Sequence, residues 1–123
     1  MQSTFAIAPT QWCVVCLCAE WCGVCREWRA AFEQAAAAHP DVRFTWIDVE
    51  DEAQAMGDFD IETFPTVLIA RGAHPRFLGP VQPSAAQLVR LLASLQERAD
   101  VPASMPEAAA LWRRIAPLLL LNP

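Results

Sequence analysis

The chain has 123 residues, 54% of them hydrophobic and 19% charged, with a net charge of -5. This length suits one domain with one core, and the low charged fraction excludes a disordered chain. An acidic chain without a basic run offers nothing to a phosphate backbone, so we expect no nucleic-acid partner. No apolar stretch approaches the ~20 residues of a membrane span, and the N-terminus lacks the features of a signal peptide. We therefore expect a cytoplasmic protein with no membrane contact.

The pattern of apolar residues predicts alternating strands and helices along the chain. Residues 12–19 form a continuous apolar run, which is typical of a strand buried on both faces of a sheet. After Gly23, apolar residues recur at helical spacing until Pro40 ends the pattern. Further elements are expected as an edge strand at 3–8, strands at 42–49, 66–70 and 76–78, a short helix at 51–58, a helix capped by Ser84 and a helix over 105–121.

The order of these elements predicts an α/β fold with a central mixed β-sheet flanked by helices. The first strand–helix–strand unit implies a parallel pair, and the tight turn at 71–75 implies an antiparallel hairpin. We divide the chain into one domain at 1–99 and a linker with a C-terminal helical extension at 100–123. The apolar stripe of the extension favours packing on the domain, with pairing to a second chain as the alternative. A monomer is therefore expected rather than a homodimer.

Cys22 and Cys25 form a C-x-x-C motif where the first strand passes into the first helix. The unpaired N–H groups and positive dipole of a helix N-terminus stabilise a thiolate, which is the attacking species in disulfide exchange. Two intervening residues bring the sulfur atoms within bonding reach, and Gly23 leaves the approach to Cys22 open. A buried pair without a redox role, or half of a metal site, is the alternative. The strand-to-helix placement favours redox chemistry, with Cys22 attacking and Cys25 resolving.

These features resemble the thioredoxin family over roughly residues 12–98. Residues 19–25 match the active-site pattern of the family except at Val24, where the family carries proline. Residues 63–66 are similar to its cis-proline loop. The resemblance implies a thioredoxin-like fold with an extra C-terminal helix, and it implies a cis peptide bond before Pro65. It assigns catalysis to Cys22 and Cys25, and contact with substrate to Trp21, Gly23, Val24, Phe64, Pro65 and Gly79.

The activity implied by the resemblance is that of a thiol–disulfide oxidoreductase acting on protein disulfides through Cys22 and Cys25. The expected direction is reduction, with electrons from an upstream reductase and with no metal or organic cofactor. The sequence departs from the family at Cys16, which occupies the place of a buried acid thought to relay the proton of the resolving cysteine. A thiol is a poor replacement for that acid. The alternative is therefore a protein-binding or chaperone-like module with little redox turnover.

The remaining cysteines, Cys13, Cys16 and Cys18, leave two interpretations open. All three are small buried apolar side chains in the first interpretation. In the second, Cys16 lies near Cys25 and acts as a third, modulating redox thiol. A metal site that combines Cys13 and Cys16 with the C-x-x-C pair is not expected, because positions three apart on a strand point to opposite faces.

Overall fold

In the computed structural model, the described residues are 7–98 and 106–121. The edge strand expected at 3–8 falls almost wholly outside them, and so do residues 100–105, where the segment at 100–123 is expected to begin as a linker. The elements follow the predicted order closely and differ from it by a few residues at their ends. They are β1 (Trp12–Cys18), α1 (Gly23–Ala38), β2 (Arg43–Asp48), α2 (Ala53–Met56), β3 (Thr66–Arg71), β4 (His74–Pro80), α3 (Ala85–Glu97) and α4 (Pro106–Leu121).

The four strands form one sheet in the order β2-β1-β3-β4, and its mixed strand directions confirm the prediction of a mixed sheet. β1 pairs parallel to β2 and antiparallel to β3, and β3 pairs antiparallel to β4. The apolar run is therefore a central strand, and residues 13–18 are all fully buried. Its side chains alternate between two separate core clusters, with Cys13 on one face and Cys16 and Cys18 on the other.

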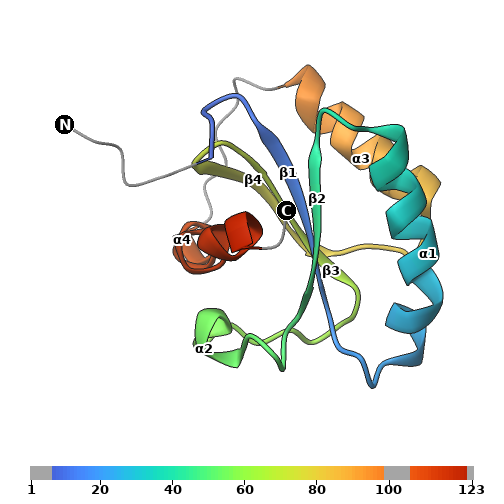
Figure 1. Ribbon diagram of the computed structural model, residues 1–123, viewed down its shortest axis with the longest axis vertical. Coiled ribbons are helices and arrows are strands. Elements are labelled where there is room, and N and C mark those ends of the chain that lie inside the picture. The colour runs from blue at the N-terminus through green and yellow to red at the C-terminus, as the bar shows by residue number, and fades with distance from the viewer. Residues whose placement is uncertain (1–6, 99–105, 122–123) are drawn as a thin grey trace.

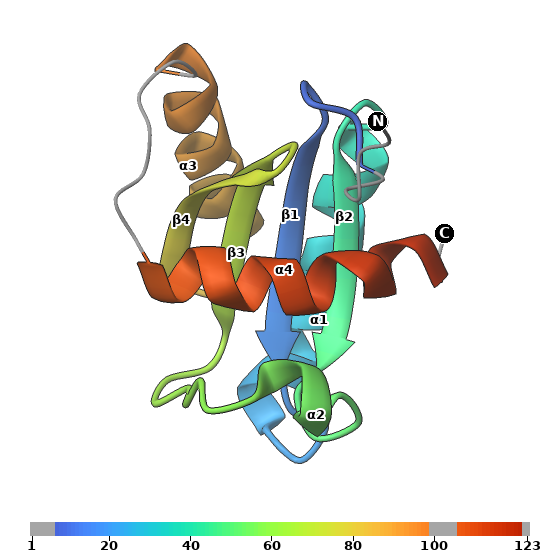
Figure 2. The same ribbon diagram turned by 90° about the vertical axis from the view of Figure 1, so that its left-hand side faces the viewer.

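Helices cover both faces of the sheet (Figure 1). α1 and α3 pack on the face that carries Cys16 and Cys18. α4 crosses the opposite face, and α2 packs against α4 (Figure 2). Ser84 caps α3 as expected, because its Oγ accepts a hydrogen bond from the Gln87 N–H at 3.3 Å. The sequence of layers is helix, sheet, helix, so neither face of the described sheet is left uncovered.

α4 packs against the sheet through its apolar side chains. Leu111, Trp112, Ile115 and Leu119 are fully buried in the core cluster on that face of the sheet. The Trp112 indole Nε1 donates a hydrogen bond to the Gly72 carbonyl at 3.0 Å. Gly72 has a φ of 59°, and a Cβ there would lie 2.5 Å from the Pro9 carbonyl oxygen, so only glycine fits this turn. Packing within the chain, the interpretation favoured from the sequence, accounts for the apolar face of the helix.

Replacing Trp112 with alanine should destabilise the fold strongly, because the change removes a fully buried ring and a buried hydrogen bond. We expect Trp112→Ala to lower the free energy of unfolding by about 3–5 kcal/mol. Urea denaturation followed by circular dichroism measures the loss. Arg113→Ala removes an exposed side chain of the same helix and should change stability by no more than about 0.5 kcal/mol. Equal midpoints for the two variants would contradict the role given to α4.

Candidate functional site

The C-x-x-C motif lies at the junction between β1 and α1, as the sequence predicts. β1 ends at Cys18, and a short turn follows in which the Cys22 N–H donates to the Ala19 carbonyl at 3.0 Å. α1 then begins at Gly23, so Cys22 occupies the N-cap position with an extended backbone. In the described part of the chain, its side chain makes no hydrogen bond to the first turn of the helix. The thiol thus lies at the positive end of α1, and it does not serve as the hydrogen-bonding cap of the helix.

The two motif cysteines differ in their access to solvent. Cys22 is partly exposed, whereas Cys25 is only 1% exposed and packs into the core beneath the helix. Gly23 and Val24 between them are exposed, and a Cβ on Gly23 would meet only the end of the Arg26 side chain, at 3.9 Å. An incoming molecule can therefore reach Cys22 but not Cys25.

An aromatic contact joins the motif to the loop that contains Pro65. Trp21 is 62% exposed, and its ring meets Phe64 edge to face with centroids 5.6 Å apart. Its indole N–H donates to a carboxylate oxygen of Glu50 at 2.7 Å, which fixes the ring against the turn after β2. The Phe64–Pro65 peptide bond is cis, as the resemblance implies. The Trp21–Phe64 contact thus joins the segment that carries Cys22 to the loop that carries Pro65, about 40 positions further along the sequence.

Gly79 lies beside the loop that contains Pro65, because its neighbour Pro80 pairs with Thr66 and the Val81 N–H donates to the Pro65 carbonyl at 3.1 Å. Gly79 is part of β4, where it pairs with Val67, and it lines a separate cavity of about 480 Å³ between the loop at 59–63 and the start of α4. Its assignment to substrate binding stays a prediction.

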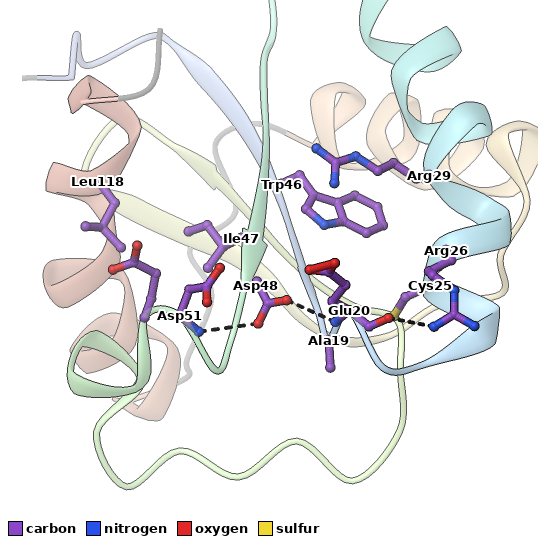
Figure 3. A pocket seen from close by; sticks show the side chains of 11 residues that line it. Ala19, Glu20, Cys25, Arg26, Arg29, Trp46, Ile47, Asp48, Asp51 and Leu118 are labelled. Carbon is purple, nitrogen blue, oxygen red and sulfur yellow. Dashed lines mark hydrogen bonds between the residues drawn. The ribbon is translucent and has the colours of Figure 1, made fainter.

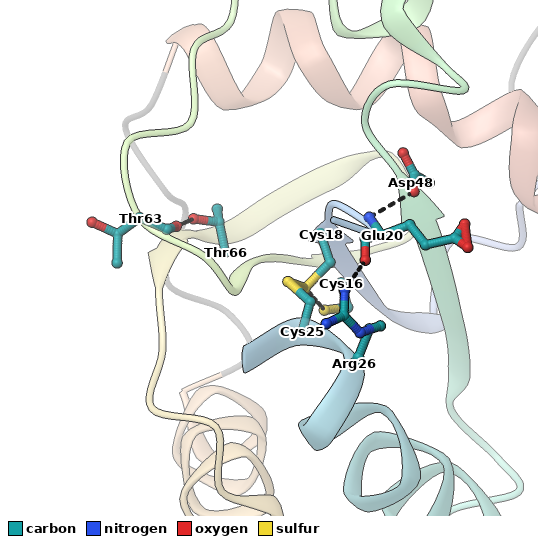
Figure 4. The surroundings of a disulfide bond; sticks show 8 residues. All are labelled: Cys16, Cys18, Glu20, Cys25, Arg26, Asp48, Thr63 and Thr66. Atoms are coloured by element: carbon teal, nitrogen blue, oxygen red, sulfur yellow. Dashed lines mark hydrogen bonds between the residues drawn. A yellow bond between two sulfur atoms is a disulfide. The ribbon is translucent and has the colours of Figure 1, made fainter. Parts of the chain in front are cut away.

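The disulfide in the structure joins Cys18 to Cys25, with their Cα atoms 5.9 Å apart (Figure 4). Cys22, Cys13 and Cys16 are free thiols. The Cys16 thiol donates a weak hydrogen bond to the Cys18 sulfur at 3.6 Å. The expected pairing of Cys22 with Cys25 is therefore not the one present, although both cysteines lie where the sequence predicts them.

Cys18 is the site residue that sequence reasoning missed. The sequence instead points to its neighbour Cys16, which occupies the place of a family acid. The available signal was the strand period, which places Cys16 and Cys18 on one face, toward the start of α1. Cys18 is the last residue of β1, and it is thus the nearer of the two to that helix start along the strand.

Cys13 and Cys16 are buried thiols that resist ionisation. Desolvation by burial raises the pKa of Cys13 to about 11, opposed by the charge of Arg43. Burial likewise raises the pKa of Cys16 to about 12, opposed by the Trp28 indole and the charge of Arg29. The two thiols lie on opposite faces of β1, as predicted. Among the described residues, no three His, Cys, Asp or Glu side chains are placed to hold a metal ion.

A polar cavity of about 280 Å³ borders Cys25 (Figure 3). The Asp48 carboxylate holds one wall in place, since it accepts hydrogen bonds from the backbone N–H groups of Glu20, Glu50 and Asp51. Arg26 donates to the Glu20 carbonyl at 2.7 Å and so ties α1 to the same wall. The lining consists of Ala19, Glu20, Cys25, Arg26, Arg29, Trp46, Ile47, Asp48, Asp51, Glu52 and Leu118.

Comparison with known proteins places this chain in a recognised family. The thioredoxin family model matches residues 4–93. Putative thioredoxin 2 of Streptomyces coelicolor is 40% identical over 53 residues, which are 43% of this chain and 40% of that protein. Thioredoxin H2-1 of Oryza sativa subsp. japonica is 33% identical over 63 residues, 51% of this chain and 46% of that protein. The chain thus spans less than half the length of these curated relatives.

Solved structures support the same fold. A thioredoxin from Trypanosoma brucei brucei superposes with a TM-score of 0.63 at 21% identity, over 74% of this chain and 80% of that one. A thioredoxin from Fasciola hepatica gives 0.62 at 22% identity, over 69% and 81%. At such identities the likeness concerns the fold alone. In the described residues, no helix is long and apolar enough to cross a membrane. Because the family model covers well over half of the sequence, the chain belongs to the thioredoxin family.

Proposed function

We propose that this protein is a thiol–disulfide oxidoreductase that reduces protein disulfides through Cys22 and Cys25. The observation that carries the proposal is the contrast between a partly exposed Cys22 at a helix N-terminus and a buried Cys25 one turn further along. A helix N-terminus favours the thiolate, and only a thiolate attacks a disulfide at a useful rate. Membership of the thioredoxin family supports the same chemistry.

The reaction proceeds in two exchanges. The Cys22 thiolate attacks one sulfur of the substrate disulfide, and the other substrate sulfur leaves as a thiolate that takes up a proton. The Cys25 thiolate then attacks Cys22 of this mixed disulfide, and the second substrate thiol departs. Two electrons pass from the dithiol to the substrate, and an upstream reductase restores the dithiol. The proton of Cys25 leaves toward the bordering polar cavity, whose walls carry carboxylates.

The substrate is held at the exposed surface beside Cys22, formed by Trp21, Val24 and the Phe64–Pro65 loop. Trp21 and Val24 are the two large apolar side chains that stand out as exposed among the described residues, at 62% and 45%. Exposed apolar side chains around a reactive group are typical of a surface that binds protein. A peptide with an apolar residue next to its disulfide fits this surface best.

Catalysed reduction of insulin tests the proposal. With dithiothreitol as the electron donor, the full chain should accelerate the loss of insulin disulfides well above the rate of dithiothreitol alone. The acceleration should saturate with insulin, because the substrate occupies a surface. A rate equal to that of dithiothreitol alone would contradict the proposal and favour the protein-binding module.

Trp21→Ala separates substrate contact from chemistry. Loss of the ring should raise the KM for insulin by roughly 5–30-fold, equivalent to 1–2 kcal/mol of binding. The rate with a small chromogenic disulfide, 5,5′-dithiobis(2-nitrobenzoic acid), should stay close to that of the wild type, since this substrate needs little surface. Gln34→Ala, exposed on α1 but far from the start of that helix, serves as the control and should change neither value. An equal loss with both substrates would contradict a role confined to binding.

A further inference from the structure

Three sulfur atoms lie together under the start of α1, and the proposed reaction uses only one of them. Cys25 is bonded to Cys18, and the thiol of Cys16 donates to the Cys18 sulfur at 3.6 Å. We propose that Cys18 is a third redox-active cysteine. It displaces Cys22 from the Cys22–Cys25 disulfide, so that the oxidised protein holds a buried Cys18–Cys25 disulfide. This inference rests on the proposed function, because Cys22 and Cys25 must first exchange disulfides.

The geometry favours Cys18 over Cys16 as the partner of Cys25. Cys18 is the last residue of β1, and its Cα lies 5.9 Å from that of Cys25, within the usual range for a disulfide. Cys16 lies one strand period further from the helix start, is a free thiol and donates to the Cys18 sulfur. The pKa of Cys16, raised to about 12 by burial, also keeps this thiol protonated. Cys16 is therefore a positioning residue, whose S–H stabilises charge on the Cys18 sulfur.

The transfer is an exchange within one chain that leaves the total oxidation state unchanged. Starting from the Cys22–Cys25 disulfide, the Cys18 thiolate attacks the Cys25 sulfur. The Cys18–Cys25 bond forms, the Cys22–Cys25 bond breaks, and Cys22 leaves as a thiolate. The proton lost by Cys18 balances the proton that Cys22 can take up. In the reverse direction, Cys22 attacks Cys25 and Cys18 leaves, with the Cys16 S–H as its hydrogen-bond donor.

The burial of the bond gives Cys22 control over its reduction. Cys18 is 0% and Cys25 1% exposed, so an external thiol cannot reach either sulfur in the folded protein. Cys22 is partly exposed and lies three residues before Cys25, on the same side of the first helical turn. Reduction must therefore pass through Cys22, which first re-forms its own disulfide with Cys25 and is then attacked from solvent. The oxidised protein meanwhile keeps a free, accessible Cys22 thiol.

Disulfide mapping tests the pairing directly. Full-length protein is oxidised with glutathione disulfide, treated with N-ethylmaleimide while folded, and cleaved after glutamate. Cleavage after Glu20 separates Cys18 from Cys22 and Cys25. We expect a cross-linked pair of fragments with the maleimide on Cys22, and the cross-link should persist in Cys16→Ala and vanish in Cys18→Ala. An uncross-linked fragment 21–27 with an internal disulfide, or a cross-link lost only in Cys16→Ala, would overturn the inference.

Reduction kinetics test whether reduction of the buried disulfide depends on Cys22. The wild type, Cys22→Ser and Cys13→Ala are refolded with glutathione disulfide and then reduced with glutathione. The Cys22→Ser disulfide should be reduced at least roughly tenfold more slowly, because reduction must wait for local opening of the structure. Cys13 lies on the opposite face of β1, so Cys13→Ala should match the wild type. Equal rates in all three proteins would overturn the claim that reduction passes through Cys22. Insulin turnover by the wild type is independent of both results, so failure of this inference is distinguishable from failure of the proposed function.

Discussion

Cys22→Ser is expected to reduce insulin turnover by about 10³-fold or more, to the rate of the electron donor alone. A serine hydroxyl stays protonated at neutral pH and does not attack a disulfide sulfur. The other cysteines cannot take over, because Cys25 is 1% exposed and the three cysteines of β1 are fully buried. The measurement is the insulin assay with dithiothreitol, together with the small chromogenic disulfide. Both rates should fall, in contrast to Trp21→Ala, where only the protein substrate is affected.

The matched control is Cys13→Ala. This variant also removes one thiol from the chain, but from the face of β1 that packs against α4. Its turnover should equal that of the wild type if the protein remains folded, which circular dichroism checks. Retained turnover in Cys22→Ser would mean that another cysteine attacks the substrate. Such a result would remove the assignment of Cys22 as nucleophile.

The fold was largely predictable because its signals are local. The continuous apolar run at 12–19 indicates a strand buried on both faces, and the strand found there, β1, lies between β2 and β3 in the sheet. Cys25, Trp28, Phe32 and Ala35 recur at helical spacing and are the buried residues of α1. The apolar stripe of α4 predicts a buried helix. The sequence alone does not identify the surface that buries this stripe, because that depends on the sheet topology. Among the elements that the structure describes, the ends differ from the prediction, since they depend on caps and neighbouring turns.

The candidate site was predictable in part. A C-x-x-C motif after a buried strand is a contiguous signal, and it located Cys22 and Cys25 correctly at the start of α1. The contact between Trp21 and Phe64 followed from the family resemblance, because spacing alone does not join segments so far apart. The partnership of Cys18 with Cys25 depends on how far β1 extends beneath the helix. That distance is a property of packing, and no pattern of residue types encodes it.

The chain is well suited to a pH experiment on its buried thiols. It contains no lysine and no tyrosine, and its nine cationic side chains are all arginine. Cysteine is therefore the side chain that ionises between pH 8 and 12, since arginine stays charged throughout that range. In the oxidised protein Cys18 and Cys25 do not titrate. The alkaline behaviour then reports mainly on Cys13 and Cys16, which are fully buried.

Stability should fall steeply above pH 9. Burial raises the pKa of Cys13 from 9.0 to about 11 and that of Cys16 to about 12, so the folded protein keeps two protons that the unfolded chain loses. Fewer bound protons in the unfolded state make stability decrease with pH, and the contribution present below pH 9 is lost as pH approaches the folded pKa values. At about 1.4 kcal/mol per pKa unit, each thiol removes between about 2 and about 3 kcal/mol by pH 11.

Urea midpoints at pH 8, 9, 10 and 11 measure this loss, and the fall should be greatest in the last two steps. The total of about 5 kcal/mol is comparable with the whole stability of a small domain, so the protein should unfold near pH 11. The double variant Cys13→Ala/Cys16→Ala lacks both thiols and should be less stable at pH 8 but nearly insensitive to pH up to 11. The two proteins should therefore cross in stability as the pH rises. Parallel curves would mean that both thiols ionise inside the folded protein, which would require solvent to reach the centre of β1.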